Sequence, residues 1–320
     1  MKFTNGFWSL KENITGNFPS CVYDIEKEAR RLAVHVPLRQ IFNRGMTLNC
    51  PMMEISVTSP LENVLRIRIT HYKGGTDPGP HFNLNEENPA VTINESETQL
   101  SFRSGELEAK ISKGDKFRID FFGAGKLLTN SAFRNIGYME SNAENGMEKQ
   151  VYMKEELALG VGEYIYGLGE RFTPFVKNGQ IVEIWNEDGG TASEIAYKNI
   201  PFYLSNNGYG VLVNHPEKVS FEIASEKVSR VGFSVPGETL EYFIIYGPEP
   251  KQVLERYTRL SGRPALVPAP AFALRLAMGE LADVLLVSQR VLPRALADSG
   301  FTFGFADLDA ALADLLGATS

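Results

Sequence analysis

The stretch "GELEAKISKGDKFRIDFFGAGKLL", residues 105–128, shows the pattern that decides the fold. Apolar side chains occupy every second position in two runs, and the turn sequences "SKGD" and "GAGK" follow the first and the second run. Alternation with a period of two is typical of strands that bury one face. Residues 105–128 are therefore predicted to form an antiparallel meander. Its inward positions are Leu107, Ala109 and Ile111 in one strand and Phe117, Ile119 and Phe121 in the next.

The same alternation continues on both sides of the meander, from about residue 22 to residue 245. In "NVLRIRITHY", residues 63–72, three apolar side chains alternate with polar ones. The apolar positions are Leu65, Ile67 and Ile69, and the polar positions are Arg66, Arg68 and Thr70. Many short strands at this spacing favour a β-sandwich. The sequence predicts a mostly β fold, in which a large antiparallel β-sandwich over residues 1–247 is followed by a short α-helical tail.

The first helix signal follows the last predicted strand. The segment "PEPKQVLERYTRLSG", residues 248–262, opens with proline and ends with a glycine, as helices commonly do. Its predicted apolar stripe consists of Val253, Leu254, Tyr257 and Leu260. Residues 248–267 are therefore predicted to be an exit helix and a linker.

Residues 268–320 differ in composition from the rest of the chain, because Lys, Asn and Tyr are absent after Pro270. Their Ala- and Leu-rich pattern predicts three short amphipathic helices, over residues 279–293, 293–300 and 307–317. A segment of about fifty residues buries little surface by itself. We therefore expect this tail to need a partner surface.

The composition is that of an ordinary globular protein. The chain has 320 residues, of which 43% are hydrophobic and 22% are charged, and its net charge is −7. A negative net charge argues against nucleic acid as a partner, since nonspecific affinity comes from neutralising phosphates. No apolar run reaches the length of a membrane span, so no membrane partner is expected. Cys21 and Cys50 give no framework of disulfides and the first residues have no apolar leader, which predicts reduced thiols and a cytoplasmic location.

The usual metal and cofactor motifs are missing from the sequence. The four histidines lie far apart along the chain and lack metal-ligand spacing. They are His35, His71, His81 and His215. The sequence also has no dinucleotide-binding glycine motif, no Walker loop and no nucleophile elbow. Neither a metal nor a cofactor is therefore predicted.

Two stretches carry unusual residues. The first is "LGVGEYIYGLGERF", residues 159–172, whose glycines predict bends where backbone segments pack closely. The adjacent Glu170 and Arg171 fit either a buried ion pair that holds such a bend or a contact to a substrate.

The second stretch is "GQIVEIWNEDGGTASEIAYKNIPFYLS", residues 179–205. Trp185, Asn186, Glu187 and Asp188 precede a pair of glycines, so an aromatic ring and several hydrogen-bonding groups are presented on a loop. A sugar needs that combination, since its C–H faces stack on an aromatic ring while its hydroxyl groups hydrogen-bond to carboxylates and amides. The alternative interpretation is a solvated loop with a packed tryptophan.

These residues also carry a family resemblance. The blocks "YGLGERFTPFVKNGQIVEIWNEDGGT" and "AYKNIPFYLSNNGYGVLVNHP", followed by "GPEPKQVLERYTRLSGRPAL", resemble the N-terminal, galactose-mutarotase-like β-sandwich of glycoside hydrolase family 31. The likeness is greatest to bacterial α-xylosidases and runs from residue 1 to about residue 267. It implies a cytoplasmic, often oligomeric enzyme that acts on α-xylosides such as isoprimeverose.

The resemblance also implies that the family's two catalytic carboxylates are absent from this chain. Retaining glycosidases need two carboxylates beside the scissile bond, and in this family both are aspartates on a barrel that follows the sandwich. The family's nucleophile block, of the type K-T-D-F-G-E, has no counterpart here, so no catalytic residue is assigned. The resemblance does match Asp188 to a substrate-contacting aspartate and Trp185 and Asn186 to its neighbours. Glu187 departs from the family, which usually has Arg there.

The tail resembles a different family. The blocks "MGELADVLL", "SQRVLPRAL", "SGFTFGF" and "LDAALADLL" are similar to the C-terminal module of short-chain-dehydrogenase-like sugar-nucleotide epimerases. The resemblances together predict a join within Pro264–Phe272, between a sandwich and an unrelated helical tail.

The predicted function is that of a substrate-loop-bearing N-terminal domain of an α-xylosidase without its catalytic barrel, inactive by itself. The alternative is a stand-alone carbohydrate-binding module that uses Trp185, Asn186 and Asp188. An α-xyloside or a related sugar is the expected ligand. Because the surface that normally packs on the barrel is uncovered, self-association through that surface is expected as well.

Overall fold

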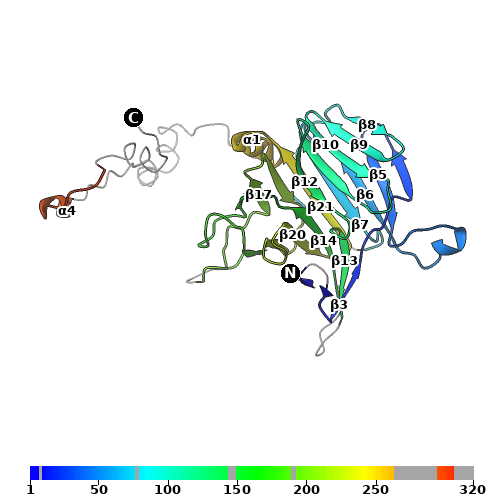
Figure 1. The fold of residues 1–320 in the computed structure, drawn as a ribbon, viewed down its shortest axis with the longest axis horizontal. Coiled ribbons are helices and arrows are strands. Elements are labelled where there is room, and N and C mark those ends of the chain that lie inside the picture. Colours follow the sequence, from blue (N-terminus) through cyan, green and yellow to red (C-terminus); the bar gives the residue numbers. More distant parts are fainter. Residues whose placement is uncertain (7–8, 76–78, 143–148, 189–191, 263–293, 306–320) are drawn as a thin grey trace. The chain divides into compact units, whose positions relative to one another are not determined.

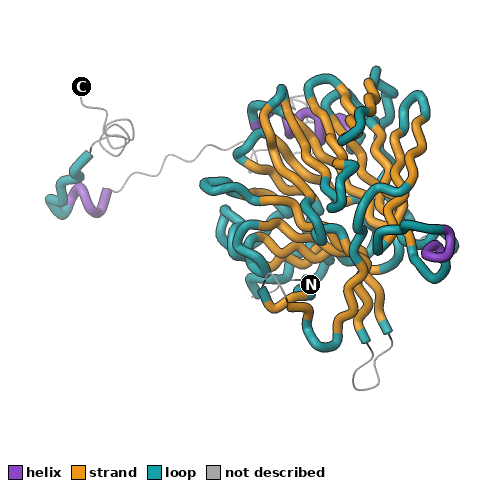
Figure 2. The backbone as a smooth tube through the Cα atoms, turned by 45° about the vertical axis from the view of Figure 1, so that its right-hand side comes forward, coloured by secondary structure: helices purple, strands orange, loops and turns teal. Residues whose placement is uncertain are grey.

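The computed structural model describes residues 1–6, 9–75, 79–142, 149–188, 192–262 and 294–305. The chain divides into two compact units, Met1–Leu266 and Val267–Ser320. Strands dominate the first unit (Figures 1 and 2). The prediction of a mostly β, antiparallel sandwich with few helices is confirmed.

Within the described residues, two large antiparallel sheets form the first unit. The larger sheet has eleven strands, and its main path runs β16-β19-β20-β14-β12-β11-β10-β9-β8, with β13 joined to β14 and β3 joined to β13. Its strands are β3 (Ile14–Asn17), β8 (Thr92–Glu95), β9 (Gln99–Ser104), β10 (Leu107–Ser112), β11 (Ile119–Gly123), β12 (Lys126–Ser131), β13 (Gly137–Ser141), β14 (Gln150–Ala158), β16 (Ile181–Ile184), β19 (Val219–Ile223) and β20 (Arg230–Pro236).

The second sheet has eight strands in the order β15-β17-β18-β21-β7-β6-β5-β4. Its strands are β4 (Asp24–Lys27), β5 (Leu32–Pro37), β6 (Met52–Thr58), β7 (Val64–Thr70), β15 (Ile165–Gly167), β17 (Phe202–Ser205), β18 (Tyr209–Val213) and β21 (Thr239–Tyr246). A small hairpin of β1 (Thr4–Asn5) and β2 (Ser9–Leu10) and a short 3-10 helix, Arg44–Thr47, complete the irregular parts.

The meander of residues 105–128 forms as predicted. Strand β10 pairs with β11 in a register that places Ala109 opposite Phe121 and Ile111 opposite Ile119. All six predicted inward side chains are buried, including Phe117, which precedes β11. Ala124 and Gly125 connect β11 to β12 with positive φ angles of 48° and 81°, as a two-residue hairpin turn requires.

The main core lies between the two sheets, because the buried apolar residues of both belong to one cluster. Alternation explains its composition, since each strand contributes every second side chain. Aromatic rings fill much of the space, and Phe121, Phe221, Phe233, Tyr203 and Tyr242 are among the largest fully buried side chains.

Helix α1 (Pro250–Leu260) packs on the outer face of the eight-stranded sheet through Val253 and Leu260. Its first turn is closed by the amide of Glu249, which donates to the side chain of Gln252 at 3.3 Å. Gly262 follows with a φ of +65°, as predicted for the helix end. Leu254, however, is 44% exposed, because it lies about 100° around the helix from Val253 and outside the narrow face that contacts the sheet.

In the second unit, α4 (Arg294–Asp298) and Gly300, with a φ of +79°, confirm the predicted helix over residues 293–300 and its glycine stop. The other two predicted tail helices, over residues 279–293 and 307–317, lie outside the described residues. Among the helices that the structure describes, none has the length and apolar character needed to cross a membrane.

Candidate functional site

The loop after β16 presents the predicted site residues. Strand β16 lies at one edge of the eleven-stranded sheet, where it pairs with β19. Beyond Ile184 the chain leaves this sheet, and Asn186 forms an isolated parallel bridge with Ala196. We call residues Trp185–Asp188 the substrate loop. All four of its side chains are exposed, and Trp185 is 51% exposed.

Asn199 anchors the substrate loop from the returning chain. Its side-chain amide donates to the carbonyl oxygen of Trp185 at 2.8 Å, to that of Ala196 at 2.5 Å and to Oδ1 of Asn186 at 3.0 Å. Its backbone amide also donates to Asn186 Oδ1, at 3.2 Å, and the amide of Glu187 donates to the Ala196 carbonyl at 3.0 Å. The side-chain oxygen of Asn186 therefore serves the loop itself, and the side chains of Trp185, Glu187 and Asp188 are exposed.

Arg171 fixes Asn199 and the end of β16 together. Its guanidinium donates to the carbonyl oxygens of Glu183 at 2.6 Å and Glu194 at 2.9 Å, and it contacts Oδ1 of Asn199. Burial lowers the pKa of this guanidinium, and the charge of the Glu183 carboxylate opposes that change. One side chain thus joins three segments beneath the substrate loop.

The predicted ion pair between Glu170 and Arg171 is wrong. Glu170 instead forms an exposed ion pair with Lys198 at 2.6 Å, with side-chain exposures of 72% and 62%. Arg171 donates to backbone carbonyl oxygens while Glu170 faces solvent. Arg171 does hold the bend, which was one part of the ion-pair interpretation. It does so through hydrogen bonds to carbonyl oxygens and not through an ion pair with Glu170.

The bend itself depends on glycine, as predicted. Gly167 and Gly169 have φ angles of +101° and +93°. A Cβ atom on Gly169 would lie 2.2 Å from the carbonyl oxygen of Lys198, and one on Gly167 would lie 2.8 Å from that of Phe202. The sequence "YGLG" therefore lets two backbone segments approach each other beside the Asn199 anchor.

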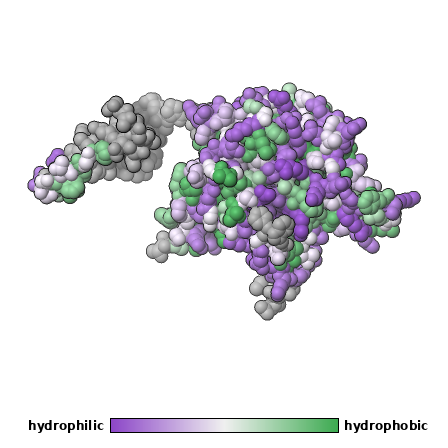
Figure 3. All heavy atoms as spheres, in the orientation of Figure 1, coloured by the Kyte–Doolittle hydropathy of each residue, from purple (hydrophilic) through white to green (hydrophobic). Residues whose placement is uncertain are grey.

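Exposed apolar side chains surround the substrate loop in the sequence. We call them the exposed aromatic surface, and its most exposed members are Phe172 and Phe175 at 78% and Tyr197 at 71%. Ile181 and Tyr164 are about half exposed. In Figure 3, hydrophobic surface is visible on the side of the sandwich that carries these loops.

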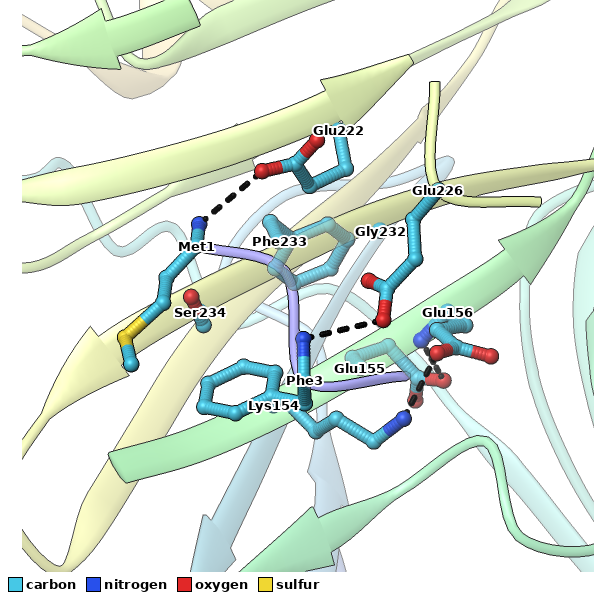
Figure 4. Close-up of a pocket in the computed structure, with 10 residues that line it drawn as sticks. All are labelled: Met1, Phe3, Lys154, Glu155, Glu156, Glu222, Glu226, Gly232, Phe233 and Ser234. Carbon is cyan, nitrogen blue, oxygen red and sulfur yellow. Dashed lines mark hydrogen bonds and ion pairs between the residues drawn. The ribbon is translucent and has the colours of Figure 1, made fainter. Parts of the chain in front are cut away.

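A second group of carboxylates lies at the N-terminus, but it encloses little space (Figure 4). The amino group of Met1 pairs with Glu222 at 3.2 Å, and the amides of Phe3 and Thr4 donate to Glu226 at 2.9 and 2.6 Å. The cavity there measures about 10 Å³, which is room for at most one water molecule. Figure 4 shows these carboxylates directed at the N-terminal backbone, so their role is to fasten that segment.

No group of three or more His, Cys, Asp or Glu side chains that could hold a metal ion occurs in the described part of the chain. Asn199 is the site residue that sequence reasoning missed, and for Arg171 it missed the partners, which are the carbonyl oxygens of Glu183 and Glu194 and the side chain of Asn199. The role of both residues depends on backbone carbonyls brought together by folding, and the only local signal was the glycine pattern beside Arg171.

Comparison with solved structures defines the class of fold. The sandwich is similar to a glycoside hydrolase family 31 dextranase from Flavobacterium johnsoniae, with a TM-score of 0.63 and 20% identity over 79% of this chain and 29% of that one. It is also similar to a family 31 α-xylosidase from a soil metagenome, with a TM-score of 0.59 and 16% identity over 79% of this chain and 36% of that one. At these identities the likeness concerns the fold.

The sequence model of the glycosyl hydrolase 31 N-terminal galactose mutarotase-like domain matches residues 52–222. The chain therefore belongs to this family. Alpha-xylosidase XylQ of Lactiplantibacillus pentosus is 45% identical over 274 residues, covering 86% of this chain and 35% of that protein. An alpha-xylosidase of Emericella nidulans is 47% identical over 292 residues, covering 86% and 37%. The chain thus spans little more than a third of the length of these relatives, and it corresponds to their N-terminal part.

Residues 269–315 match a different family, a domain of unknown function, DUF1731. This match agrees with the resemblance of the tail to the C-terminal module of the epimerases.

Proposed function

We propose that residues 1–267 act as the substrate-loop-bearing N-terminal domain of an α-xylosidase. The observation that carries the proposal is the substrate loop, in which a half-exposed Trp185 and the exposed carboxylate of Asp188 stand on a backbone tied down by Asn199. Both relatives described above are α-xylosidases. An aromatic ring and a carboxylate on one loop suit a sugar, whose C–H face stacks while its hydroxyls donate hydrogen bonds.

Each exposed residue of the loop has a proposed role. The indole of Trp185 packs against the sugar ring, the carboxylate of Asp188 accepts hydrogen bonds from its hydroxyls, and Asn186 holds the loop in shape. Glu187 adds a second acceptor, so this loop favours a ligand that offers hydroxyl donors.

We propose no hydrolysis by this chain alone. Retention requires two carboxyl groups about 5 Å apart on either side of the glycosidic bond. Glu187 and Asp188 are adjacent in sequence on an exposed loop, and we propose that they do not form such a pair. The domain would therefore supply substrate contacts, and a catalytic domain would supply the acid pair.

A chimera tests this role. Residues 1–267 would replace the matching segment of the Lactiplantibacillus pentosus α-xylosidase, and hydrolysis of p-nitrophenyl α-xyloside would be measured. We expect activity, and Asp188→Ala should lower kcat/KM about tenfold or more, because a hydrogen bond to a charged group is lost. Glu170→Ala, an exposed carboxylate outside the loop, should have no effect. A folded, active chimera that is indifferent to Asp188→Ala would contradict the proposal.

The half-exposed Trp185 also supports a second candidate, a stand-alone carbohydrate-binding module. Titration calorimetry of the full chain with xylose and with isoprimeverose separates the two. Millimolar binding that is lost in Asp188→Ala would favour the module, whereas no heat of binding would favour a loop that works only beside a catalytic domain.

Self-association is a further part of the proposal. The exposed aromatic surface has three large side chains that are more than two-thirds exposed, Phe172, Phe175 and Tyr197, and exposed apolar side chains favour association, so we propose that a second copy of this chain covers it. Light scattering of the full chain should show oligomers, and replacing Phe172 and Phe175 by serine should shift the population to monomers. A monodisperse monomer before substitution would contradict this.

For location we propose the cytoplasm. Cys21 and Cys50 are free thiols in the structure, which suits a reducing compartment.

A further inference from the structure

The loop between β5 and β6, residues 38–51, carries apolar side chains into solvent. We call it the β5–β6 loop, and it includes the short 3-10 helix. Phe42 is 78% exposed and Leu48 is 70% exposed. The loop forms the blue projection on the right of Figure 1, and hydrophobic surface is visible on this projection in Figure 3. Exposed apolar side chains that gather in one place mark interaction sites.

Hydrogen bonds within the β5–β6 loop hold its shape. Arg39 Nη2 donates to the carbonyl oxygens of Met46 at 3.3 Å and Leu48 at 3.2 Å. The side chain of Asn43 accepts a hydrogen bond from the amide of Met46, also at 3.3 Å. A loop whose shape is already set loses less conformational entropy when it binds a partner. The exposed side chains of Phe42 and Leu48 are therefore held ready for a contact.

The β5–β6 loop is also positively charged. Residues 38–51 include Arg39 and Arg44 but no Asp or Glu, and the side chain of Arg44 is exposed. Complementary charge selects between partners and steers their encounter. A partner for this loop should therefore combine exposed apolar side chains with negative charge.

The exposed aromatic surface supplies the apolar half of that combination. The amide of Glu170 donates to the carbonyl oxygen of Lys198 at 3.0 Å. This hydrogen bond places the segments of Phe172 and Tyr197 side by side, and Phe175 follows Phe172 after one turn of the chain. The three most exposed rings of the surface therefore stand on segments that are tied to each other.

Carboxylates dominate the charge around these rings. Within residues 164–205, the exposed charged side chains that the structure describes are four carboxylates and one ammonium group, those of Glu170, Glu187, Asp188, Glu194 and Lys198. The ammonium group of Lys198 already pairs with Glu170 at 2.6 Å, so a net negative charge faces a partner. The surface thus complements the β5–β6 loop both in apolar character and in charge.

The β5–β6 loop and the exposed aromatic surface of one copy lie on opposite sides of the sandwich. In the eight-stranded sheet, β5 and β6 lie near the β4 end, whereas β15 and β17, which flank the surface in the sequence, form the other end. Five strand spacings, about 24 Å in all, separate β5 from β17. Figure 1 shows the loop projecting away from β17. A contact between the loop and the surface therefore requires two copies of the chain.

We propose that the β5–β6 loop of one copy docks on the exposed aromatic surface of a second copy, in a head-to-tail contact. The proposal rests on the self-association proposed above and names the two surfaces that make it. A head-to-tail contact joins two different patches, whereas a two-fold dimer would join the aromatic surface to itself. The two arrangements respond differently when one patch is removed.

Two double variants of the full chain test the contact by sedimentation velocity. Phe42→Ser with Leu48→Ser removes the apolar part of the loop, and Phe172→Ser with Phe175→Ser removes that of the surface. Each variant alone should be monomeric, with a dissociation constant at least about tenfold higher than that of the unchanged chain. An equimolar mixture should form a dimer, because one variant keeps an intact loop and the other keeps an intact surface.

Arg44→Glu tests the charge of the contact. Placed in the variant that keeps its loop, it should weaken the mixed dimer about tenfold, because it sets a carboxylate against the carboxylates of the surface. Leu127→Ser is the matched control, since Leu127 is an apolar side chain that is 42% exposed and lies on β12 of the other sheet. It should leave the association unchanged.

The proposal is overturned if the loop variant alone associates as the unchanged chain does, or if the mixture stays monomeric. Association that is lost in the surface variant but kept in the loop variant overturns this contact and leaves the proposed self-association in place. An unchanged chain that is monomeric overturns both. Because all four substituted side chains are exposed, the urea midpoints of the variants should match that of the unchanged chain.

Discussion

Gly169 makes the closest backbone approach in the bend beneath the substrate loop. Its φ of +93° is one that other residues adopt only with strain, and a Cβ atom would lie 2.2 Å from the Lys198 carbonyl oxygen. Lys198 immediately precedes the anchor Asn199, so a shift there displaces the hydrogen bonds that hold Trp185. A substitution at Gly169 is therefore expected to change both the stability of the fold and the shape of the substrate loop.

We predict that Gly169→Ala destabilises the fold by about 2–4 kcal/mol, from strain plus a backbone clash. Gly237→Ala is the control, because Gly237 has a similar φ of +95° but open space around its Cβ position, and should cost only about 1 kcal/mol. Urea unfolding measures both. Equal losses of unfolding free energy in the two variants would show that the clash with the Lys198 carbonyl oxygen does not contribute to the destabilisation.

Glu155 is the buried carboxyl group of the core whose ionisation matters near neutral pH. Burial raises its pKa to about 7, although Ser131 and Tyr242 donate hydrogen bonds to it at 2.8 and 3.1 Å. Its pKa in the unfolded chain stays near 4.5. The folded state thus holds the proton more tightly, and the stability from this group is complete below pH 4.5 and is lost as pH rises to about 7.

Glu155→Gln should remove this pH dependence. The difference between the two pKa values corresponds to about 3 kcal/mol of unfolding free energy. Urea unfolding of both proteins between pH 5 and 8 gives the comparison, and subtracting one curve from the other cancels all other titrating groups. Parallel curves would contradict the assignment to Glu155.

At the scale of elements, helix α1 shows that packing against the sheet decides which residues of a predicted apolar stripe are buried. Leu254 and Leu260 both belong to the predicted apolar stripe, but Leu260 is fully buried and Leu254 is 44% exposed. We predict that Leu260→Ala costs about 2–5 kcal/mol, as core truncations do, and that Leu254→Ala costs less than about 1 kcal/mol. Thermal or urea unfolding decides. A similar cost for both would mean that the helix sits differently on the sheet.

The strands could be predicted because their signal is local. Period-two alternation in residues 105–128 depends only on near neighbours, and the hairpin turn at Ala124 and Gly125 follows from the same stretch. The sheet order could not be predicted from residue patterns. Strand β21 pairs with β7 and β14 pairs with β20, and such pairings between distant segments depend on how the whole core fills.

The candidate site also has one part that a local sequence pattern predicts and one part that depends on contacts between distant segments. The grouping of Trp185 with Asp188 was visible in the sequence, because the two residues lie three positions apart on one predicted loop. Asn199 and the partners of Arg171 were not visible, because these contacts are made to carbonyl oxygens of Glu183, Glu194 and Trp185 that only the folded chain assembles. The mistaken pairing of Glu170 with Arg171 has the same origin, since adjacency in sequence does not mean contact.

At the scale of the molecule, the chain joins parts of two families. Residues 52–222 match the N-terminal domain of family 31, and residues 269–315 match a family that is distinct from it. The first compact unit, Met1–Leu266, contains both large sheets, their shared core and helix α1. This sandwich carries the substrate loop, and we propose that the acid pair for hydrolysis belongs to a part of the relatives that the matched residues do not include.

The release of p-nitrophenol from p-nitrophenyl α-xyloside by the purified full chain tests that claim most directly. We predict a rate equal to that of buffer, unchanged by Asp188→Ala. Turnover that follows the protein through purification and is abolished by substituting Glu187 or Asp188 would contradict the account, because it would place a complete catalytic pair on the sandwich.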